Sequence, residues 1–266
     1  MEKHDWDNVF NFAKVLVLDA GDQIRLSFKQ KLIIDFKENA SDLVTNMDKQ
    51  IEKFFIQKIN EKYPSHHILG EEGYGEELTS LDGIVWIIDP IDGTMNFVHM
   101  QRHFAISVGI YHNGEGVIGF IYDVVADDLY YAVKGRGAFV NGEALPPLKS
   151  TEIGKAVIGI NAAWGIENKR IDSSITSALI RDVRGTRSFG SATLEMAYIA
   201  SGKIDGYLSM RLAPWDYAAG KILIEELGGK ISSVSGEPLQ LLTKQTPVFA
   251  AKPGLHEYIL ENYFKK

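Results

Sequence analysis

An apolar run of the chain ends in two carboxylates three positions apart, Asp89 and Asp92, and the pair Gly93-Thr94 follows at once. Paired carboxylates concentrate negative charge, which is costly unless a hard cation such as Mg2+ neutralises it. Backbone N–H groups at the start of a helix present partial positive charge to a phosphate. This order of residues predicts a metal ion beside a phosphate, and therefore phosphoryl chemistry.

Pro90 lies between the two carboxylates, and its fixed φ stiffens the turn that separates them. Side chains at positions i and i+3 of such a turn can be directed at one point. Gly93 permits a close backbone approach, and its amide and that of Thr94 can face a phosphate oxygen. The alternative, from these residues alone, is that Asp92-Gly93 forms a loop turn and Asp89 caps a helix.

Further acidic residues stand at two other places in the chain. Glu71 and Glu72 lie in a glycine-flanked acidic loop, and Asp216 precedes a helix rich in alanine and glycine. Taken alone, loop glutamates are usually solvated and Asp216 is an ordinary N-cap. Only their combination with the central motif favours a site.

The composition excludes several classes of function. The 266 residues allow one large domain or two small ones. The net charge of -7 argues against binding to nucleic acid, and the lack of cysteine excludes disulfides and thiolate metal sites. No apolar stretch has the length of a membrane span or a signal core. The sequence therefore predicts a soluble cytoplasmic protein that binds neither nucleic acid nor membrane.

Apolar periodicity predicts two helices near the amino terminus, over about 10–28 and 42–62, followed by a strand at 84–88. Short β-branched and aromatic runs then predict an antiparallel meander with strands at 105–111, 117–122, 129–133 and 137–140. Asn113-Gly114 and Asn141-Gly142 are typical hairpin turns.

The second part alternates strands at 156–160, 206–210 and 230–234 with helices at 171–181, 188–201 and 216–227. We predict an α+β fold with layered helices and sheets, mixed and antiparallel. Pro146-Pro147 is the expected junction between an N-terminal subdomain, 1–146, and a C-terminal subdomain, 147–266, within one compact unit.

The motifs in combination resemble the inositol monophosphatase family, whose members are magnesium-dependent, lithium-sensitive phosphatases. The resemblance covers nearly the whole chain and is carried by residues 45–48, 70–72, 86–97, 190–192 and 215–220. It implies a layered α-β-α-β-α fold and a homodimer. It also implies hydrolysis of a phosphate monoester by a metal-activated water, with no covalent enzyme intermediate.

The resemblance implies two or three Mg2+ ions in each active site. One ion would be held by Glu71, Asp89 and the backbone carbonyl of Ile91. A second would be held by Asp89, Asp92 and Asp216, so that Asp89 bridges the two ions. Two ions roughly 3.5–4 Å apart can activate water on one side and neutralise the leaving oxygen on the other.

The resemblance also implies roles around the phosphate. Gly93 and Thr94 would bind it, and the Thr94 hydroxyl with Asp48 would orient and activate the attacking water. Glu72 would be a catalytic residue in or near the layer of groups that surrounds the metal ligands. The Gly-Ser-Ala turn would contribute to phosphate or substrate binding, through Gly190, Ser191 and Ala192.

Substrate choice depends on residues where the chain departs from many inositol-selective relatives. These carry a glutamate at the position of Ser209, where it contacts sugar hydroxyls, and Arg211 nearby adds a cation that could attract a second phosphate or be structural. We expect broad specificity that includes inositol 1-phosphate. The 2′-phosphate of NADP and fructose 1,6-bisphosphate remain alternatives, and 3′-phosphoadenosine 5′-phosphate fits less well.

Other interpretations of the motifs are weaker. Haloacid-dehalogenase-like phosphatases place their second aspartate two residues after the first, whereas here the spacing is three and Pro90 intervenes. A non-catalytic anion-binding module has little use for so many acidic groups. His99 and His103 have a zinc-like spacing, but their segment resembles a loop. Gly135-Arg136-Gly137 is better explained by a hairpin than by a nucleotide-binding loop.

Overall fold

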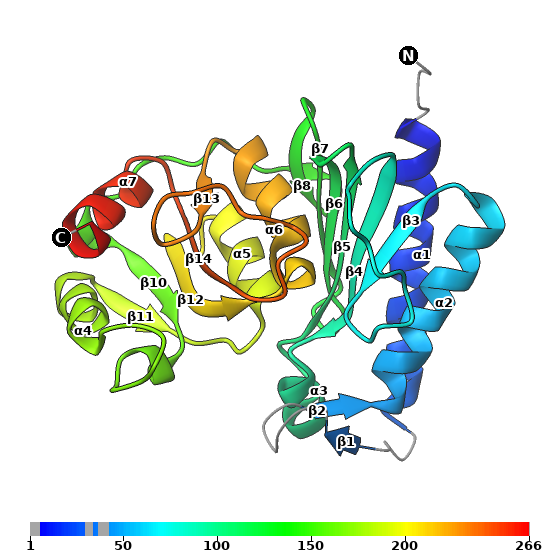
Figure 1. The fold of residues 1–266 in the computed structure, drawn as a ribbon, viewed down its shortest axis with the longest axis horizontal. Coiled ribbons are helices and arrows are strands. Elements are labelled where there is room, and N and C mark those ends of the chain that lie inside the picture. Colours follow the sequence, from blue (N-terminus) through cyan, green and yellow to red (C-terminus); the bar gives the residue numbers. More distant parts are fainter. Residues whose placement is uncertain (1–5, 30–33, 37–42, 266) are drawn as a thin grey trace.

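The computed structural model describes residues 6–29, 34–36 and 43–265, and its elements form five layers (Figure 1). Helices α1 (Trp6–Ser27) and α2 (Asn46–Lys62) cover the outer face of a seven-stranded sheet. Helices α5 (Ala192–Ala200) and α6 (Pro214–Glu226) lie between this sheet and a five-stranded one. Helices α4 (Ser173–Asp182) and α7 (Leu255–Ile259) lie outside the second sheet. The predicted α-β-α-β-α layering is confirmed.

The seven-stranded sheet has the order β3-β4-β5-β6-β7-β8-β9 and is antiparallel except for the β3–β4 pair. Its strands are β3 (His67–Gly70), β4 (Ile84–Asp92), β5 (Ala105–His112), β6 (Glu115–Asp123), β7 (Asp128–Val133), β8 (Gly137–Val140) and β9 (Glu143–Ala144). Both predicted Asn-Gly turns have positive φ at their two residues. The predicted meander is therefore confirmed, whereas β3 and β9 lie in segments for which we predicted no strand.

The five-stranded sheet has the order β11-β10-β12-β14-β13, and its β10, β11 and β12 strands are parallel. Its strands are β10 (Val157–Ile160), β11 (Gly185–Arg187), β12 (Gly206–Leu212), β13 (Lys230–Ser232) and β14 (Thr246–Ala251). Strand β14 runs antiparallel to both of its neighbours, which makes the sheet mixed, as predicted. Strands β11 and β14 and helix α7 were not predicted.

The remaining elements are short. A hairpin of β1 (Ile34–Phe36) and β2 (Leu43–Thr45) precedes α2, and α3 (Thr94–Met100) follows β4. Single turns occupy Ile153–Lys155, Ala162–Trp164 and Leu260–Phe264.

Helices α2 and α5 begin later than predicted, for the same reason. Helix α2 begins at Asn46 because the Thr45 side chain accepts the N–H of Met47 and so ends β2 as a cap. Helix α5 begins at Ala192, not at 188, because Ser191 caps it and Gly190 has a φ of +80°. Capping side chains thus set both starts.

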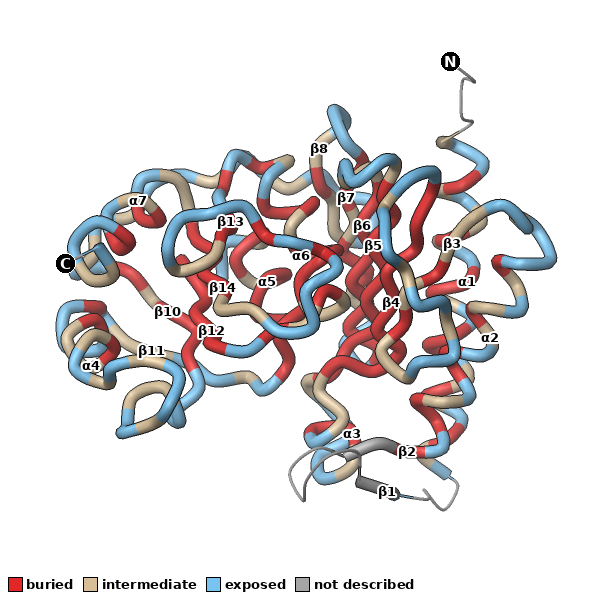
Figure 2. Tube along the Cα trace, viewed as in Figure 1, coloured by how far each residue is buried: buried red, intermediate tan, exposed pale blue. Residues whose placement is uncertain are grey.

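Strand β4 separates two apolar cores and is buried along its whole length (Figure 2). Trp86 and Ile88 pack in the core that α1 and α2 share with the sheet. Val85 and Ile87 pack in the core that α5 and α6 fill between the sheets. A third core lies between the second sheet and helices α4 and α7. A strand with two covered faces needs apolar residues on both, which explains the continuous run before Asp89.

Helix α6 approaches the seven-stranded sheet so closely that two positions opposite it must be glycine. A Cβ on Gly109 would lie 2.9 Å from the Cβ of Ala218, and one on Gly119 would lie 2.8 Å from the carbonyl oxygen of Ala219. Close packing of small residues on glycines fixes the helix on β5 and β6. It thereby fixes Asp216 in the first turn of α6.

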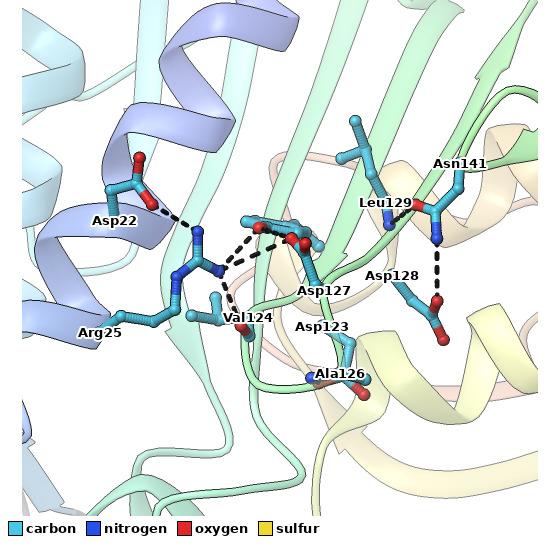
Figure 3. A network of polar contacts seen from close by, with 10 residues as sticks. Asp22, Arg25, Asp123, Val124, Ala126, Asp127, Asp128, Leu129 and Asn141 are labelled. Atoms are coloured by element: carbon cyan, nitrogen blue, oxygen red, sulfur yellow. Dashed lines mark hydrogen bonds and ion pairs between the residues drawn. The ribbon is translucent and has the colours of Figure 1, made fainter.

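The end of α1 is fastened to the turn between β6 and β7 (Figure 3). The Arg25 guanidinium donates to Asp22 at 2.5 Å, to the hydroxyl of Tyr122 at 2.7 Å and to the carbonyl of Val124 at 2.8 Å. In the same turn Asp123 accepts the N–H of Ala126 at 3.1 Å. These contacts join the outer helix layer to the sheet.

The sheet changes between β9 and β10, which supports the division at residues 146 and 147 that we propose for the two subdomains. Helix α6 belongs to the second part of the chain but packs on the first sheet, so the two parts share one core. Within the described residues, no helix is both long enough and apolar enough to cross a bilayer.

Candidate active site

Asp89 and Asp92 lie at a bulge near the end of β4 rather than in a turn after it. Asp89 pairs with Ser107 and Asp92 with Ala105, so β4 has one more residue than β5 over this interval. The N–H of Ile91 donates to Asp89 Oδ1 at 3.0 Å. A bulge bends the strand and re-aims its side chains. The expected turn is therefore wrong in form, although both carboxylates still come from one short segment.

The structure brings Asp216 to this pair. Ligand oxygens of Asp89, Asp92 and Asp216 all lie within 4.8 Å of one another. Asp216 is the third residue of α6 and not its N-cap, which is Ala213, and Asp216 Oδ2 accepts the N–H of Ala213 at 2.8 Å. The N-cap interpretation of Asp216 is therefore wrong, but its hydrogen bond to Ala213 and its place in the cluster are compatible, since a carboxylate has two oxygens.

Glu71 lies at the edge of the cluster, where its N–H donates to the carbonyl of Ile88 at 3.2 Å. Burial raises the pKa of Asp89 well above its usual range, and the charges of Glu71, Asp92 and Asp216 raise it further. Such buried and mutually repelling carboxylates are costly by themselves. Their hard oxygen donors fit Mg2+, which would remove the repulsion.

Asp92 is oriented by helix α5, a link that we did not predict. Its Oδ2 accepts the Ser191 hydroxyl at 2.5 Å, the Thr193 hydroxyl at 2.6 Å and the Thr193 N–H at 2.7 Å. Ser191 is buried, and its hydroxyl faces Asp92. The part of Ser191 in phosphate binding stays a prediction.

Thr94 lies between Asp48 and the backbone of Ile91. Its Oγ1 is 3.1 Å from both Asp48 Oδ1 and the Ile91 carbonyl oxygen, and its single proton can go to either. Asp48 Oδ2 accepts the Thr45 N–H at 2.8 Å and the Thr45 hydroxyl at 2.5 Å. Burial raises the pKa of Asp48 to about 6 although these hydrogen bonds oppose the shift. A base in this range can accept a proton near neutral pH.

Gly93 stands where the two parts of the chain meet. It has a φ of +92°, and a Cβ there would lie 3.2 Å from the carbonyl oxygens of both Gly190 and His103. Asn96 bridges the same place, because its Nδ2 donates to the carbonyls of His103 and Phe189 at 2.7 Å each. The turn of Gly190 is therefore held against the start of α3.

The other predicted site residues lie in the acidic loop after β3, in helix α5 and in strand β12. Glu72 is half-buried, and the role of its side chain stays a prediction. Ala192 is the first residue of α5. Ser209 is buried on β12, where its Oγ accepts the N–H of Arg211 at 3.4 Å, and Arg211 is exposed. Substrate binding by Ala192, Ser209 and Arg211 stays a prediction too.

The structure also tests the interpretations of the histidine pair, His99 and His103, and of the segment Gly135-Arg136-Gly137. His99 lies in α3, so the loop that we expected there is wrong, and His103 follows with a φ of +57°. Among the described residues, the aspartate cluster is the sole group of three or more potential metal ligands within reach of each other. Gly135 and Gly137 form the predicted hairpin, where both amides donate to Glu226.

A cavity of about 530 Å³ lies between the loop 70–79 and the segment 241–244, and none of Asp89, Asp92 and Asp216 lines it. Glu71 and Trp215, the neighbour of Asp216, belong to its wall. Two of the predicted metal-ligand segments therefore border a cleft.

Glu195 is a buried carboxyl close to the site. Its Oε1 accepts the Phe189 N–H at 2.9 Å, in the turn that precedes Gly190. Burial raises the pKa of Glu195 to about 7, and the charge of Asp92 adds to the shift. Its ionised form is therefore disfavoured in the folded protein.

Replacing Glu195 by glutamine tests this burial through the pH dependence of stability. Because the folded pKa is raised, the stabilisation by Glu195 is full below pH 4.5 and is lost as pH rises through 7. The free energy of unfolding of the wild type should lose about 3 kcal/mol from this group over that interval. Urea unfolding with a chelator, at pH 5 and pH 8, should show that Glu195→Gln lacks this loss. Equal pH dependence of both proteins would contradict the assignment.

Comparison with known proteins shows likeness over nearly the full length. The family model of the inositol monophosphatase family matches residues 5–264. The inositol-1-monophosphatase of Bacillus subtilis is 54% identical over 259 residues, which are 97% of each chain.

Solved structures agree with the sequence comparison. SaIMPase-II, an inositol monophosphatase of Staphylococcus aureus, is known with inositol monophosphate bound, at 38% identity and a TM-score of 0.88 over 97% of this chain and 94% of that one. The same protein with 2′-AMP bound gives 40% identity and a TM-score of 0.89, over 97% and 95%. An IMPase/NADP phosphatase in complex with Mg2+ and phosphate is 27% identical, with a TM-score of 0.87 over 96% and 94%.

Proposed function

Since this chain belongs to the inositol monophosphatase family and is a phosphoric monoester hydrolase, we propose that it hydrolyses inositol 1-phosphate and related sugar or polyol phosphates with Mg2+ as cofactor. The observation that carries the proposal is the convergence of Asp89, Asp92 and Asp216. Carboxylates from two distant segments have little reason to share a buried space unless a cation joins them. Glu71 and the Ile91 carbonyl complete the ligand set that we propose.

The residues around the cluster have different roles in the reaction. Bound Mg2+ supplies Lewis acidity, which lowers the pKa of water and neutralises the leaving oxygen. Asp48 takes a proton through the Thr94 hydroxyl, 3.1 Å away, so that a water held there becomes nucleophilic. The amides of Gly93 and Thr94 bind the phosphate oxygens, and Glu72 lies next to the metal ligands.

Asp92 is kept in place by Ser191 and Thr193, so the N-terminus of α5 faces the same space. The start of that helix, Gly190 to Ala192, then serves as the wall against which the substrate lies. The products are an alcohol and inorganic phosphate, and no phospho-aspartate forms.

A second candidate substrate is a nucleotide with a 2′-phosphate. It is favoured by a relative that binds 2′-AMP and by another described as an NADP phosphatase. Ser209 also supports it, because a serine leaves more room than the glutamate that we expect in inositol-selective relatives. We therefore propose broad specificity, with fructose 1,6-bisphosphate as a further alternative.

The test is phosphate release from four substrates by the chelator-treated protein, with and without Mg2+, and again with Li+. The substrates are inositol 1-phosphate, 2′-AMP, NADP and fructose 1,6-bisphosphate. We expect turnover that requires Mg2+ and is inhibited by Li+, with inositol 1-phosphate among the substrates. Turnover in the presence of chelator would refute the metal mechanism, and inactivity on all four would refute the substrate class.

Ser209→Glu tests the substrate pocket. The longer carboxylate would accept hydrogen bonds from sugar hydroxyls and would repel a second phosphate. We expect kcat/KM for inositol 1-phosphate relative to 2′-AMP to rise about tenfold, the value of one charged hydrogen bond. An unchanged ratio would contradict the placement of Ser209 at the substrate, and Ser235→Glu, in the segment between β13 and β14, is the surface control.

We further propose, from the likeness to the family, that the protein is a cytoplasmic homodimer that acts on small phosphorylated molecules, without nucleic acid or membrane partners. Light scattering on the eluting protein would give twice the chain mass of 29.6 kDa if the dimer forms.

A further inference from the structure

Helix α2 carries a second buried carboxylate, Glu52, one turn after Asp48. Glu52 has no exposed surface. Its Oε2 accepts the N–H of Glu72 at 2.6 Å, and its Oε1 accepts the N–H of Tyr74 at 2.8 Å. Both oxygens thus bind the backbone of the acidic loop that contains Glu71.

The loop fits closely around this carboxylate. A Cβ on Gly70 would lie 2.5 Å from the Glu52 carboxyl carbon, so only glycine allows the backbone to pass there. On the other side of the loop, the Glu71 N–H is bound to the Ile88 carbonyl of β4. Glu71 therefore stands between two anchors, one on the strand that carries Asp89 and one on α2.

We propose that Glu52 is a positioning residue that places Glu71 at the metal cluster through the backbone of residues 70–74. The inference rests on the proposed function, because it takes Glu71 as a ligand of Mg2+. Glu52 itself contacts the loop backbone. Helix α2 then positions two parts of the site. It carries Asp48, which contacts the Thr94 hydroxyl, and Glu52, which holds the loop that contains Glu71.

The chemistry requires a carboxylate rather than an amide at this position. Two backbone N–H groups point at the two side-chain oxygens, and a glutamine offers only one oxygen. Its NH2 group would face one of the N–H groups, so that a buried donor loses its acceptor and the loop moves away. Groups that orient metal ligands typically change metal affinity by about 10–100-fold when they are replaced.

The experiment compares Mg2+ binding, by calorimetry without substrate, in the wild type and in Glu52→Gln. Hydrogen exchange at the amides of Glu72 and Tyr74 in the chelator-treated proteins reports the anchor directly. We expect Mg2+ binding to weaken at least about tenfold and the protection of both amides to fall. Gly70→Ala leaves Glu52 unchanged but places a Cβ 2.5 Å from its carboxyl carbon, so the loop must move. It should weaken Mg2+ binding as well, which keeps the test valid if Glu52→Gln does not fold.

Asp205→Asn is the matched control for lost stability. Asp205 is also buried and accepts a backbone N–H, that of Val157 at 2.8 Å, but in the second sheet. The Asp205→Asn variant should have a lower melting temperature, while its Mg2+ affinity stays within about twofold of that of the wild type. Equal weakening in Asp205→Asn, or unchanged Mg2+ affinity in folded Glu52→Gln, would overturn the proposal. If the wild type itself binds no Mg2+, the proposed function fails first, and the positioning role fails with it.

Discussion

Asp89→Asn should lower kcat/KM by about three orders of magnitude or more, because it removes the charge that we place between both metal ions. The fold should survive the change. Asparagine has the same shape and keeps a side-chain oxygen for the N–H of Ile91, which lies 3.0 Å from Asp89 Oδ1. Phosphate release at saturating Mg2+ measures the loss of turnover, and the melting temperature in chelator shows whether the variant is folded.

The metal-free Asp89→Asn protein should even gain stability at neutral pH. Burial and three neighbouring acidic groups raise the pKa of Asp89, so the ionised carboxylate lowers the free energy of unfolding. Asparagine has no such charge and removes this destabilisation. Asp123→Asn is the control, because Asp123 is buried in the same sheet and accepts the Ala126 N–H (Figure 3). It should keep turnover within about twofold of the wild type. Retained turnover in folded Asp89→Asn would refute the metal assignment.

Thr94→Ala should lower kcat by about 10²- to 10⁴-fold, the usual contribution of general acid–base catalysis. The change removes the hydroxyl that lies 3.1 Å from Asp48 and leaves the buried carboxylate without a path to the water. Thr94→Ser keeps the hydroxyl and should recover most of the rate. Steady-state kinetics with inositol 1-phosphate measures both variants.

The pair of Thr94 variants also separates positioning from chemistry. If Thr94→Ser is as slow as Thr94→Ala, the methyl group and the packing around α3 matter more than the hydroxyl. If Thr94→Ala is as fast as the wild type, the proton path through Asp48 is wrong.

The layered fold could be predicted from the sequence because its long elements are strongly periodic. The meander between Ala105 and Val140 is one example. Another is the helix predicted at 216–227, which the structure has at Pro214–Glu226. Strands β3 and β11 could not be predicted, because each contains only one β-branched residue and is defined by its neighbours in the sheet. Strand β14 contains Pro247 and two alanines, a composition with weak strand preference.

The geometry of the site was predictable only where it follows from local sequence. The bulge between Asp89 and Asp92 depends on the register of β5, which no local pattern contains. The hydrogen bonds from Ser191 and Thr193 to Asp92 join residues about a hundred positions apart.

Glu52 is different, because its signal was present in the sequence. A helix with Ile51, Phe55 and Ile59 on its buried face also carries Asp48 and Glu52 next to that face. Acidic residues are almost never fully buried unless they have partners. The apolar pattern predicts the helix, and the resemblance assigns a role to Asp48 but none to Glu52.

Crystals of the protein soaked with Mn2+, a divalent ion with a strong anomalous signal, test the central claim most directly. The account predicts two or three anomalous peaks among the carboxylates of Glu71, Asp89, Asp92 and Asp216. An anomalous map with no peak in contact with Asp89 would contradict it.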